Sequence, residues 1–261
     1  MLSITRIKQL KSLHKKKFRR QENKFLLEGY RLINQALSAN TQIEEIWITK
    51  KSLDFSYGKN LIDQIENKKI PWSIAPDKII RQISNSLNDQ GIIALAPIPV
   101  YNQYKNPPQQ SLYLDGISDP GNMGTLLRTA VWFGIKSVFR SSKCVDPFNS
   151  KVVRSAMGAH FYFSHFEVIS EDKIFNDYIK SGMEILGSDV EGCPIHTLNL
   201  SNTKGWILIL GNEAHGISKS ACSMITTMVT LPGVKGMESL NVSVAGGILL
   251  HALTSPNVVT N

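Results

Sequence analysis

Glycines and polar side chains that could bind a ligand are concentrated in three segments of the C-terminal half. In residues 119–130, Pro120 and Gly121 favour a turn after a predicted strand, and a helix should follow. Asn122 lies near the start of that helix, where it could cap it, and Arg128 lies well beyond the turn. On its own, the segment is equally typical of an ordinary capped helix with a surface arginine.

The second segment, residues 211–217, follows the apolar run 206–210. Ligands of open parallel sheets bind at the carboxyl ends of strands, and glycines there let a ligand approach the backbone. Glu213 adds a fixed carboxylate at this position. The alternative interpretation is a glycine-rich turn between a strand and a helix. In that turn we expect His215 to be a turn residue rather than a general base.

The third segment, residues 231–245, joins a predicted strand to the C-terminal helix and carries four closely spaced polar side chains. They are Glu238, Ser239, Asn241 and Ser243. Either Ser239 or Asn241 could cap the helix, because Ser and Asn side chains accept hydrogen bonds from the first helical N–H groups. Four polar groups beside glycines exceed what one cap requires, so the segment indicates a ligand site.

Basic residues are concentrated at the N-terminus. The chain has 261 residues and a net charge of +8, and residues 1–31 contain ten Lys or Arg against two Glu, which accounts for the whole excess. Such a block favours a polyanionic partner. Nucleic acid is favoured over an anionic membrane because the block lacks a strong apolar face, and the alternative is a solvated helix face. The candidate nucleic-acid contacts are Lys15, Lys16, Lys17, Arg19, Arg20 and Arg31.

Composition limits the remaining classes. A hydrophobic content of 42% and a charged content of 19% suit a globular protein. No apolar run is long enough to cross a membrane and no secretory signal opens the chain, so we expect no membrane partner. The three cysteines, Cys144, Cys193 and Cys222, form no C-x-x-C pair. We interpret them as buried thiols in a reducing cytoplasm and expect no metal site.

Apolar runs that alternate with helical patterns predict two α/β domains. The first, residues 1–97, should contain strands at 25–27, 43–49, 72–74 and 91–96 and helices at 29–37, 61–65 and 78–83. A proline-rich linker is predicted at 98–110. The second domain, residues 111–261, should be a parallel sheet covered by helices on both faces. Its strands are expected at 112–115, 136–139, 166–169, 184–188, 206–210 and 228–231, and its helices at 123–133, at 147–159 with Asp146 as N-cap, and at 240–253.

The three polar segments resemble, in order and spacing, the signature motifs of SpoU-type RNA ribose methyltransferases, the TrmH family of the SPOUT superfamily. The matching residues are Asn122, Gly124, Arg128, Gly211, Glu213, Gly216, Pro232, Glu238, Ser239, Leu240, Asn241 and Ser243. Residues 146–159 are similar to the family as well, and residues 25–33 and 90–94 resemble its ribosomal-protein-like RNA-binding domain. One departure is Lys235, where the family usually has glycine. The loop length is kept, so we expect cofactor binding to survive.

This resemblance implies a trefoil-knotted second domain, a homodimer through that domain with the active site at the subunit interface, and S-adenosylmethionine as the methyl donor. The implied activity is methyl transfer to a ribose 2′-hydroxyl of structured RNA, with large-subunit rRNA favoured over tRNA. The residues that would bind the cofactor are Gly211, Asn212, Glu213, Gly216, Leu231, Ser239, Leu240 and Asn241.

The resemblance also implies catalytic roles. Arg128 would stabilise the developing alkoxide or hold the adjacent phosphate, because a guanidinium keeps its proton at neutral pH and is a poor base. Asn122 would position Arg128 and the ribose. Glu213 would orient the site, and pairing with Arg128 is one way to do so. Ser239 and Asn241 would hydrogen-bond the cofactor or the RNA.

Two alternatives come from other classes of protein. A non-catalytic RNA-binding or ribosome-assembly protein would use the basic segment and the first domain equally well. In the enzyme, Arg154 would grip a phosphate. The complete motif set favours the enzyme, because a binding protein has no use for a methyl-donor pocket. A dinucleotide-dependent oxidoreductase is excluded, since no G-x-G-x-x-G follows the first strand of either domain.

Overall fold

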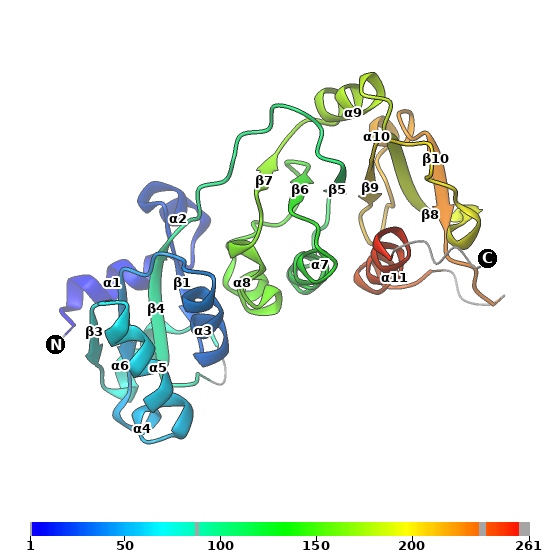
Figure 1. The fold of residues 1–261 in the computed structure, drawn as a ribbon. Coiled ribbons are helices and arrows are strands. Elements are labelled where there is room, and N and C mark those ends of the chain that lie inside the picture. Colours follow the sequence, from blue (N-terminus) through cyan, green and yellow to red (C-terminus); the bar gives the residue numbers. More distant parts are fainter. Residues whose placement is uncertain (1, 87–88, 235–238, 256–261) are drawn as a thin grey trace. The chain divides into compact units, whose positions relative to one another are not determined.

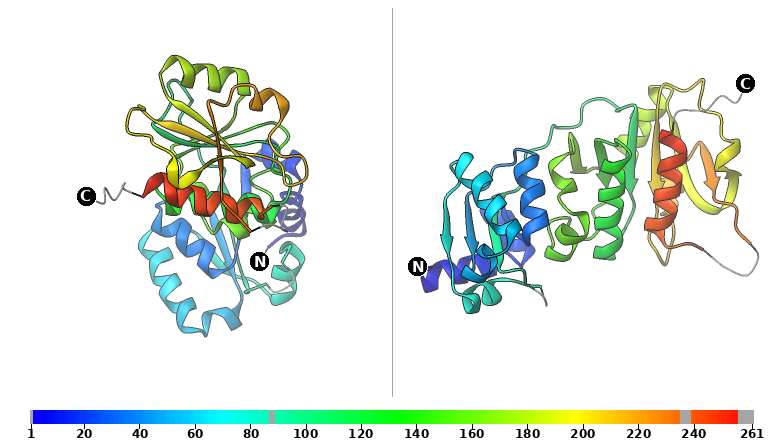
Figure 2. Two further views of the ribbon diagram at one scale, coloured as in Figure 1. Left: turned by 90° about the vertical axis from the view of Figure 1, so that its right-hand side faces the viewer. Right: turned by 60° about the horizontal axis from the view of Figure 1, so that its bottom comes forward.

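The computed structural model describes residues 2–86, 89–234 and 239–255, and the chain forms two compact units. The first unit combines the residues up to Val100 with Asp146–Phe161, and the second combines Tyr101–Val145 with the residues from Tyr162 onward. Figure 1 labels most of the helices and strands of both units, and Figure 2 shows the same ribbon from two further sides. Among the described helices, none has the length and apolar character that a membrane span requires.

A four-stranded sheet with the order β1-β4-β2-β3 forms the centre of the first unit. β4 is antiparallel to β1 and β2, whereas β2 and β3 are parallel. The strands are β1 (Lys24–Glu28), β2 (Glu45–Ile48), β3 (Trp72–Ile74) and β4 (Ile92–Pro97). Each lies where a short apolar run predicts it.

Alternate residues of these strands face two apolar layers, so helices cover both sides of the sheet. Phe25 and Leu27 of β1 share a core with α3, α5 and α8. Leu26 and Trp47 face the opposite side and pack with α1 and α6. The helices of this unit are α1 (Ile4–Ser12), α2 (Lys16–Glu22), α3 (Tyr30–Ser38), α4 (Lys50–Leu53), α5 (Ser56–Asn67), α6 (Asp77–Ile83), α8 (Ser150–Ala156) and the 3₁₀ helix η1 (Ala159–Phe161).

Residues 146–161 pack in the first unit, although their place in the sequence is between two strands of the second. Val153 of α8 is buried in the core that β1, α3 and α5 share. Phe148 and Phe161 pack at the edge of that core. The first unit is therefore built from two separate stretches of the chain, whereas the sequence pattern predicts one continuous domain at 1–97.

The helix expected at 147–159 is shorter than predicted and begins differently. It spans Ser150–Ala156, and its cap is Asn149, whose side chain accepts a hydrogen bond from the backbone of Lys151. The prediction of Asp146 as the cap is wrong, because the Asp146 carboxylate instead pairs with the buried guanidinium of Arg19.

A six-stranded sheet, parallel throughout, forms the second unit with the order β10-β8-β9-β5-β6-β7. This confirms the predicted parallel sheet. Its strands are β5 (Gln110–Leu114), β6 (Ser137–Arg140), β7 (His165–Val168), β8 (Glu184–Pro194), β9 (Trp206–Leu210) and β10 (Thr227–Thr230). β8 is longer than the predicted 184–188, because its second half pairs with β10 beyond a register shift.

Helices cover both faces of this sheet, as predicted. On one face, Tyr113 of β5 and Phe175 of α9 pack edge to face in a shared core. On the other, α7 and α11 lie side by side (Figures 1 and 2). A Cβ on Gly246 of α11 would lie 2.6 Å from Leu126 and 2.7 Å from Leu210, so this contact is very close. The helices are α7 (Pro120–Trp132), α9 (Glu171–Lys180), η2 (Ile195–Thr197), α10 (Lys219–Cys222) and α11 (Val242–Thr254).

The interpretation of the cysteines as buried thiols is correct for Cys144 alone. Cys144 is buried, Cys193 is partly exposed and Cys222 is exposed, and all three are free. Burial raises the pKa of the Cys144 thiol. Within the described part of the chain, no three His, Cys, Asp or Glu side chains are arranged to hold a metal ion.

Candidate functional site

The loop after β9, residues 211–217, is tightly folded at the carboxyl end of the parallel sheet. Backbone hydrogen bonds in both directions join Asn212 and Gly216. A Cβ on Gly211 would lie 2.3 Å from backbone atoms of Gly216, so the fold of the loop itself requires this glycine. Gly216 has a φ of +67° and open space on the side where a Cβ would lie, which leaves its backbone accessible to a ligand.

The Asn212 side chain ties this loop to the neighbouring loop between β5 and α7. Its Nδ2 donates to the carbonyl oxygen of Gly116 at 2.7 Å. Its Oδ1 accepts hydrogen bonds from the backbone N–H groups of Ala214 and His215. His215 therefore belongs to the turn through its backbone, and its side chain is exposed.

The carboxylate of Glu213 points to the start of α7. Oε1 accepts a hydrogen bond of 3.0 Å from Asn122 Nδ2, and Oε2 accepts one of 3.2 Å from the Ser118 hydroxyl. The backbone N–H groups of Ser118 and Asp119 also donate to this carboxylate, at 3.4 Å. Partial burial alone would raise the pKa of Glu213, but these hydrogen bonds, first among them that of Asn122, hold it below its usual value.

The side chain of Asn122 joins all three polar segments. While its Nδ2 donates to Glu213, its Oδ1 accepts a hydrogen bond of 3.0 Å from Asn241 Nδ2 and one of 3.5 Å from the Ser243 hydroxyl. The prediction that Asn122 caps α7 is wrong, because Asp119 caps it and accepts a hydrogen bond of 2.8 Å from the Asn122 N–H. We call Asn122, Glu213, Asn241 and Ser243 the motif cluster.

Asn241 is the cap of α11, one of the two alternatives that the sequence leaves open. Its Oδ1 accepts hydrogen bonds from the N–H of Ser243 at 2.9 Å and from the hydroxyl of the same residue at 2.6 Å. One side chain thus begins the helix with its oxygen and holds Asn122 with its nitrogen.

The loop between β10 and α11 carries the other residues predicted to bind a cofactor. Leu231 is partly exposed, and Ser239 and Leu240 are exposed next to the cap of α11. Lys235 and Glu238, which belong to the third polar segment, lie outside the described residues.

Ser118 belongs to the site, although it is not among the residues predicted from the sequence. Its hydroxyl and its backbone N–H both donate to Glu213. A signal was available, because Ser118 follows β5, and the carboxyl ends of parallel strands are where ligand sites form.

Arg128 does not join the motif cluster within one chain. Six residues of helix separate it from Asn122, which directs the two side chains about 120° apart. Arg128 is exposed, and no ion pair among the described residues connects it with Glu213, so the predicted pair does not form within the chain. Arg128 lies instead in an exposed stripe of α7 with Thr125 and Trp132.

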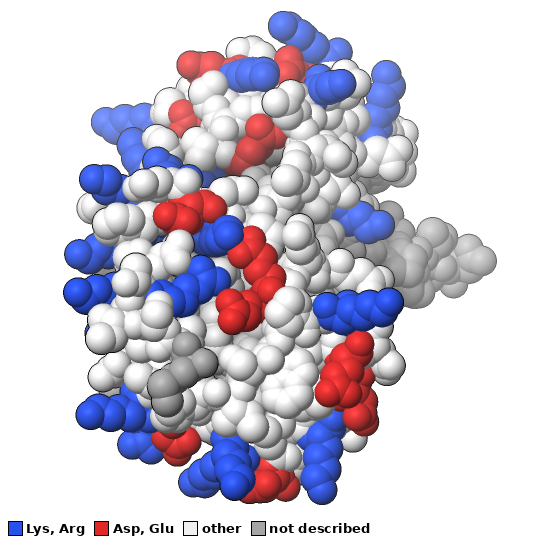
Figure 3. All heavy atoms as spheres, turned by 90° about the vertical axis from the view of Figure 1, so that its left-hand side faces the viewer, with Lys and Arg blue, Asp and Glu red and all other residues white. Residues whose placement is uncertain are grey.

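The basic N-terminal segment is largely exposed, with one exception. Figure 3 shows Lys and Arg side chains over one face of the molecule, with acidic side chains between them. Arg19 is only 3% exposed, donates to the carbonyl oxygen of Leu13 at 2.7 Å and pairs with Asp146. Its predicted RNA contact is therefore wrong, since the guanidinium is used inside the unit. The exposed candidates are Lys15, Lys16, Lys17, Arg20 and Arg31.

Arg154 of α8 faces a buried carboxylate. Its Nη1 lies 3.6 Å from Glu28 Oε1, and the two side chains are 31% and 5% exposed. The other oxygen of Glu28 accepts hydrogen bonds from the Ser84 hydroxyl at 2.6 Å and the Asn85 N–H at 3.2 Å. Arg154 is thus held at one side by Glu28, while part of its guanidinium remains accessible.

The second unit is an α/β domain whose polar loops meet at the carboxyl end of a parallel sheet, which is the position of ligand sites in such folds. Comparison with known families matches residues 109–251 to the SpoU rRNA Methylase family and residues 5–94 to the MRM3-like substrate binding domain. The first match covers more than half of the chain. The chain belongs to the SpoU rRNA methylase family.

Relatives are similar over nearly the whole chain. The chain is 28% identical over 251 residues to the 23S rRNA (guanosine(2553)-2′-O)-methyltransferase RlmP of Bacillus subtilis, covering 95% of each protein. It is 26% identical to the 23S rRNA (guanosine-2′-O-)-methyltransferase RlmB of Neisseria meningitidis, covering 89% of this chain and 96% of the relative. A putative RNA methyltransferase of the TrmH family from Porphyromonas gingivalis has a TM-score of 0.81 and 29% identity, covering 97% of this chain and 98% of the other. These comparisons confirm the predicted family and fold class.

Proposed function

We propose that this protein transfers a methyl group from S-adenosylmethionine to a ribose 2′-hydroxyl of large-subunit rRNA. The observation that carries this proposal is the motif cluster, in which Asn122, Glu213 and Asn241 come from three distant segments and are hydrogen-bonded at one edge of the sheet. The names of the two relatives that specify 23S rRNA and 2′-O-methylation support the substrate and the reaction.

The loops beside the motif cluster fit S-adenosylmethionine. A nucleoside with an amino-acid tail needs apolar faces, backbone polar groups and room near the backbone. The exposed side chain of Leu240, the partly exposed Leu231 and the open backbone at Gly216 offer these, with the Ser239 hydroxyl beside them. Bound there, S-adenosylmethionine supplies an activated methyl group together with its leaving group.

The residues of the motif cluster orient the site. The Asn122 amide is held from both sides, by Glu213 and by Asn241, so its orientation and that of the first turn of α7 are fixed. Fixed dipoles need no reorganisation when the ribose oxygen becomes more negative during the reaction. Arg128, as a cation, stabilises that oxygen or holds the neighbouring phosphate.

In a homodimer formed through the second unit, Arg128 would lie at the interface with the second copy. Trp132, in the same stripe of α7 as Arg128, is 82% exposed, and Val244 and Ile248 form an exposed apolar stripe on the adjacent α11. Large apolar side chains gathered on one exposed face are typical of protein interfaces. We propose that this face pairs with a second copy and that Arg128 acts at the interface.

Three further features belong to the same proposal. We propose that the second unit is threaded as a trefoil knot, on the strength of the motif resemblance. The free cysteines support a reducing compartment, and we propose that the protein acts in the cytoplasm. We also propose that the reaction uses no metal.

A map of 2′-O-methylated nucleotides in RNA from cells with and without the gene tests the substrate. We expect methylation to disappear from 23S rRNA and to remain unchanged in tRNA; the reverse pattern would contradict the proposed substrate. Calorimetric titration of the purified protein with S-adenosylmethionine tests the enzyme. A protein that binds RNA but no S-adenosylmethionine would instead be a non-catalytic RNA-binding or assembly protein.

A further inference from the structure

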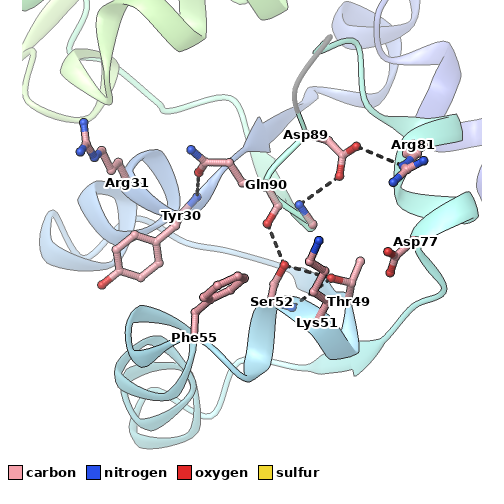
Figure 4. A pocket seen from close by; sticks show the side chains of 11 residues that line it. Tyr30, Arg31, Thr49, Lys51, Ser52, Phe55, Asp77, Arg81, Asp89 and Gln90 are labelled. Atoms are coloured by element: carbon pink, nitrogen blue, oxygen red, sulfur yellow. Dashed lines mark hydrogen bonds and ion pairs between the residues drawn. The ribbon is translucent and has the colours of Figure 1, made fainter.

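A pocket of about 730 Å³ in the first unit is lined by both aromatic and charged side chains. It is bordered by the start of α3, by the region of α4, by α6 and by the residues that precede β4. Two aromatic side chains and three cationic ones line it, together with two carboxylates (Figure 4). These are Tyr30, Phe55, Arg31, Lys51, Arg81, Asp77 and Asp89.

The floor of this pocket is held by a set of hydrogen bonds. The Ser52 hydroxyl donates to the carbonyl oxygen of Gln90 at 2.9 Å and lies 2.9 Å from the Thr49 hydroxyl. The Gln90 side chain accepts a hydrogen bond of 2.9 Å from the N–H of Tyr30. Gly91 has a φ of +67°, and a Cβ there would lie 2.2 Å from the Ser52 hydroxyl oxygen. The pocket is therefore preformed by the fold.

The rim carries the groups that unpaired nucleotides need. Tyr30 and Phe55 lie at one end in Figure 4, Arg81 lies at the other, and Lys51 lies between them. Phe55 is 45% exposed, so a base can stack on its ring without unfolding the unit. Lysine and arginine contact phosphates, and a carboxylate such as Asp77 accepts hydrogen bonds from base amino groups.

A second cavity extends this site. It has a volume of about 240 Å³, shares Arg31, Asp89 and Gln90 with the first, and reaches Glu28 and Arg154. Arg81 and Arg154 are paired with Asp89 and Glu28, whereas Lys51 and Arg31 lie along the cavities as candidate phosphate contacts. Two adjoining cavities of this kind suit successive nucleotides of a strand better than one small molecule. We propose that this paired cavity, the nucleotide groove, binds unpaired nucleotides of the substrate RNA, with a base stacked on Phe55 or Tyr30 and phosphates at Lys51 and Arg31. The identity of the ligand as substrate RNA rests on the proposed function.

Fluorescence anisotropy of the full-length protein with a labelled single-stranded RNA of about eight nucleotides tests the groove. We expect Phe55→Ala and Tyr30→Ala each to weaken binding roughly 5- to 150-fold, because a base would lose its stacking partner. The loss should persist at high salt, since stacking involves no net charge. Phe55→Trp should keep the affinity, because it keeps an aromatic face.

Matched cation variants separate the groove from general electrostatics. Lys51→Gln should lower the slope of log affinity against log salt by about 0.7, the value for one lost phosphate contact to a single strand. Lys59→Gln removes an exposed lysine of α5 that does not line the groove, and it should leave the slope unchanged. Equal effects of the two variants would overturn the proposal, and so would alanine variants of the aromatic residues that bind as the wild type does.

Two further measurements keep the outcome decisive. If the alanine variants fail to fold, photocrosslinking of the wild type to a 4-thiouridine-substituted strand decides: adducts on peptides with Tyr30 or Phe55 support the groove, and adducts only elsewhere overturn it. Binding of S-adenosylmethionine by the same samples tests the proposed function separately. If an alanine variant no longer binds the single strand but still methylates RNA normally, the groove is not a binding site for the substrate. If the wild type binds the strand in the groove but transfers no methyl group, the proposed methyltransferase function is wrong.

Discussion

The Glu213 carboxylate makes part of the protein's stability depend on pH. Hydrogen bonds from Asn122 and from the backbone of Ser118 and Asp119 lower its pKa from the ordinary value of 4.5. A carboxyl group whose pKa is lower in the folded than in the unfolded protein adds stability above its unfolded pKa and loses it as pH falls through its folded pKa. We expect Glu213→Gln to reduce the free energy of unfolding at neutral pH, with the difference fading below pH 4.5. Urea unfolding across this range measures it, and a pH-independent difference would refute it.

Arg128 should affect the chemistry and leave cofactor binding intact. Arg128→Ala should lower kcat by about 100-fold or more, because a charge that acts in the transition state is lost. Arg128→Lys should also be poor, since a point charge does not reproduce the guanidinium fork. Single-turnover kinetics and titration with S-adenosylmethionine on both variants check this. Near-normal turnover in either would remove Arg128 from the mechanism.

Two neighbouring arginines of α2 should behave in opposite ways. Arg19 is buried against Asp146, and Arg20 is exposed. Arg19→Gln should reduce the free energy of unfolding by about 3–5 kcal/mol, because it leaves a carboxylate without its buried partner. Arg20→Gln should change stability by less than about 0.5 kcal/mol. Urea unfolding of both variants decides, and equal stabilities would contradict the assigned roles.

At the scale of elements, the loop after β9 should not tolerate a side chain at Gly211. Gly211→Ala would place a Cβ 2.3 Å from backbone atoms of Gly216 and Ile217, which is closer than a Cβ can approach unless the backbone shifts. We expect a loss of about 1–3 kcal/mol of stability and weaker binding of S-adenosylmethionine, because the loop must change shape. Gly233→Ala is the matched control, since nothing lies within 4 Å of its added Cβ. Thermal melts and titrations that show the same change for both would contradict this.

Most elements could be predicted from the sequence, because they depend on local periodicity. The strands of both sheets are short apolar runs, and the rule that ligands bind at strand ends indicated the loop with Glu213. The resemblance to the family motifs, and not local periodicity, grouped Asn122 and Asn241 with it. The errors arise where distant residues compete for the same group. Asp146 has the residue type and position of a helix cap, but its carboxylate is instead paired with Arg19, which is 127 residues away in the sequence. The N-terminal charge pattern likewise could not show which one of its arginines is buried.

At the scale of the whole molecule, the exposed Trp132 of α7 and the apolar stripe of α11 determine the expected assembly. Trp132→Asp should convert a dimer into a monomer and abolish methyl transfer, because Arg128 lies in the same stripe. Ile4→Asp is a control at an apolar side chain that is 75% exposed on α1, and it should leave the dimer intact. Light scattering of both variants measures the mass. A dimeric Trp132→Asp protein would require a different interface.

Because residues 146–161 pack in the first unit, they constrain the order in which the protein can fold during synthesis. Chains generally fold from the N-terminus as they leave the ribosome, one unit at a time. Here the ribosome must synthesise β5, α7 and β6 before Val153 can take its place in the N-terminal core. A nascent chain shorter than this exposes an uncovered apolar face, which is a binding site for chaperones. Splitting the gene at the proline-rich stretch 98–110 would therefore separate α8 from the core of the first unit. The N-terminal fragment would lack α8, and the C-terminal fragment would contain α8 without the core against which it packs.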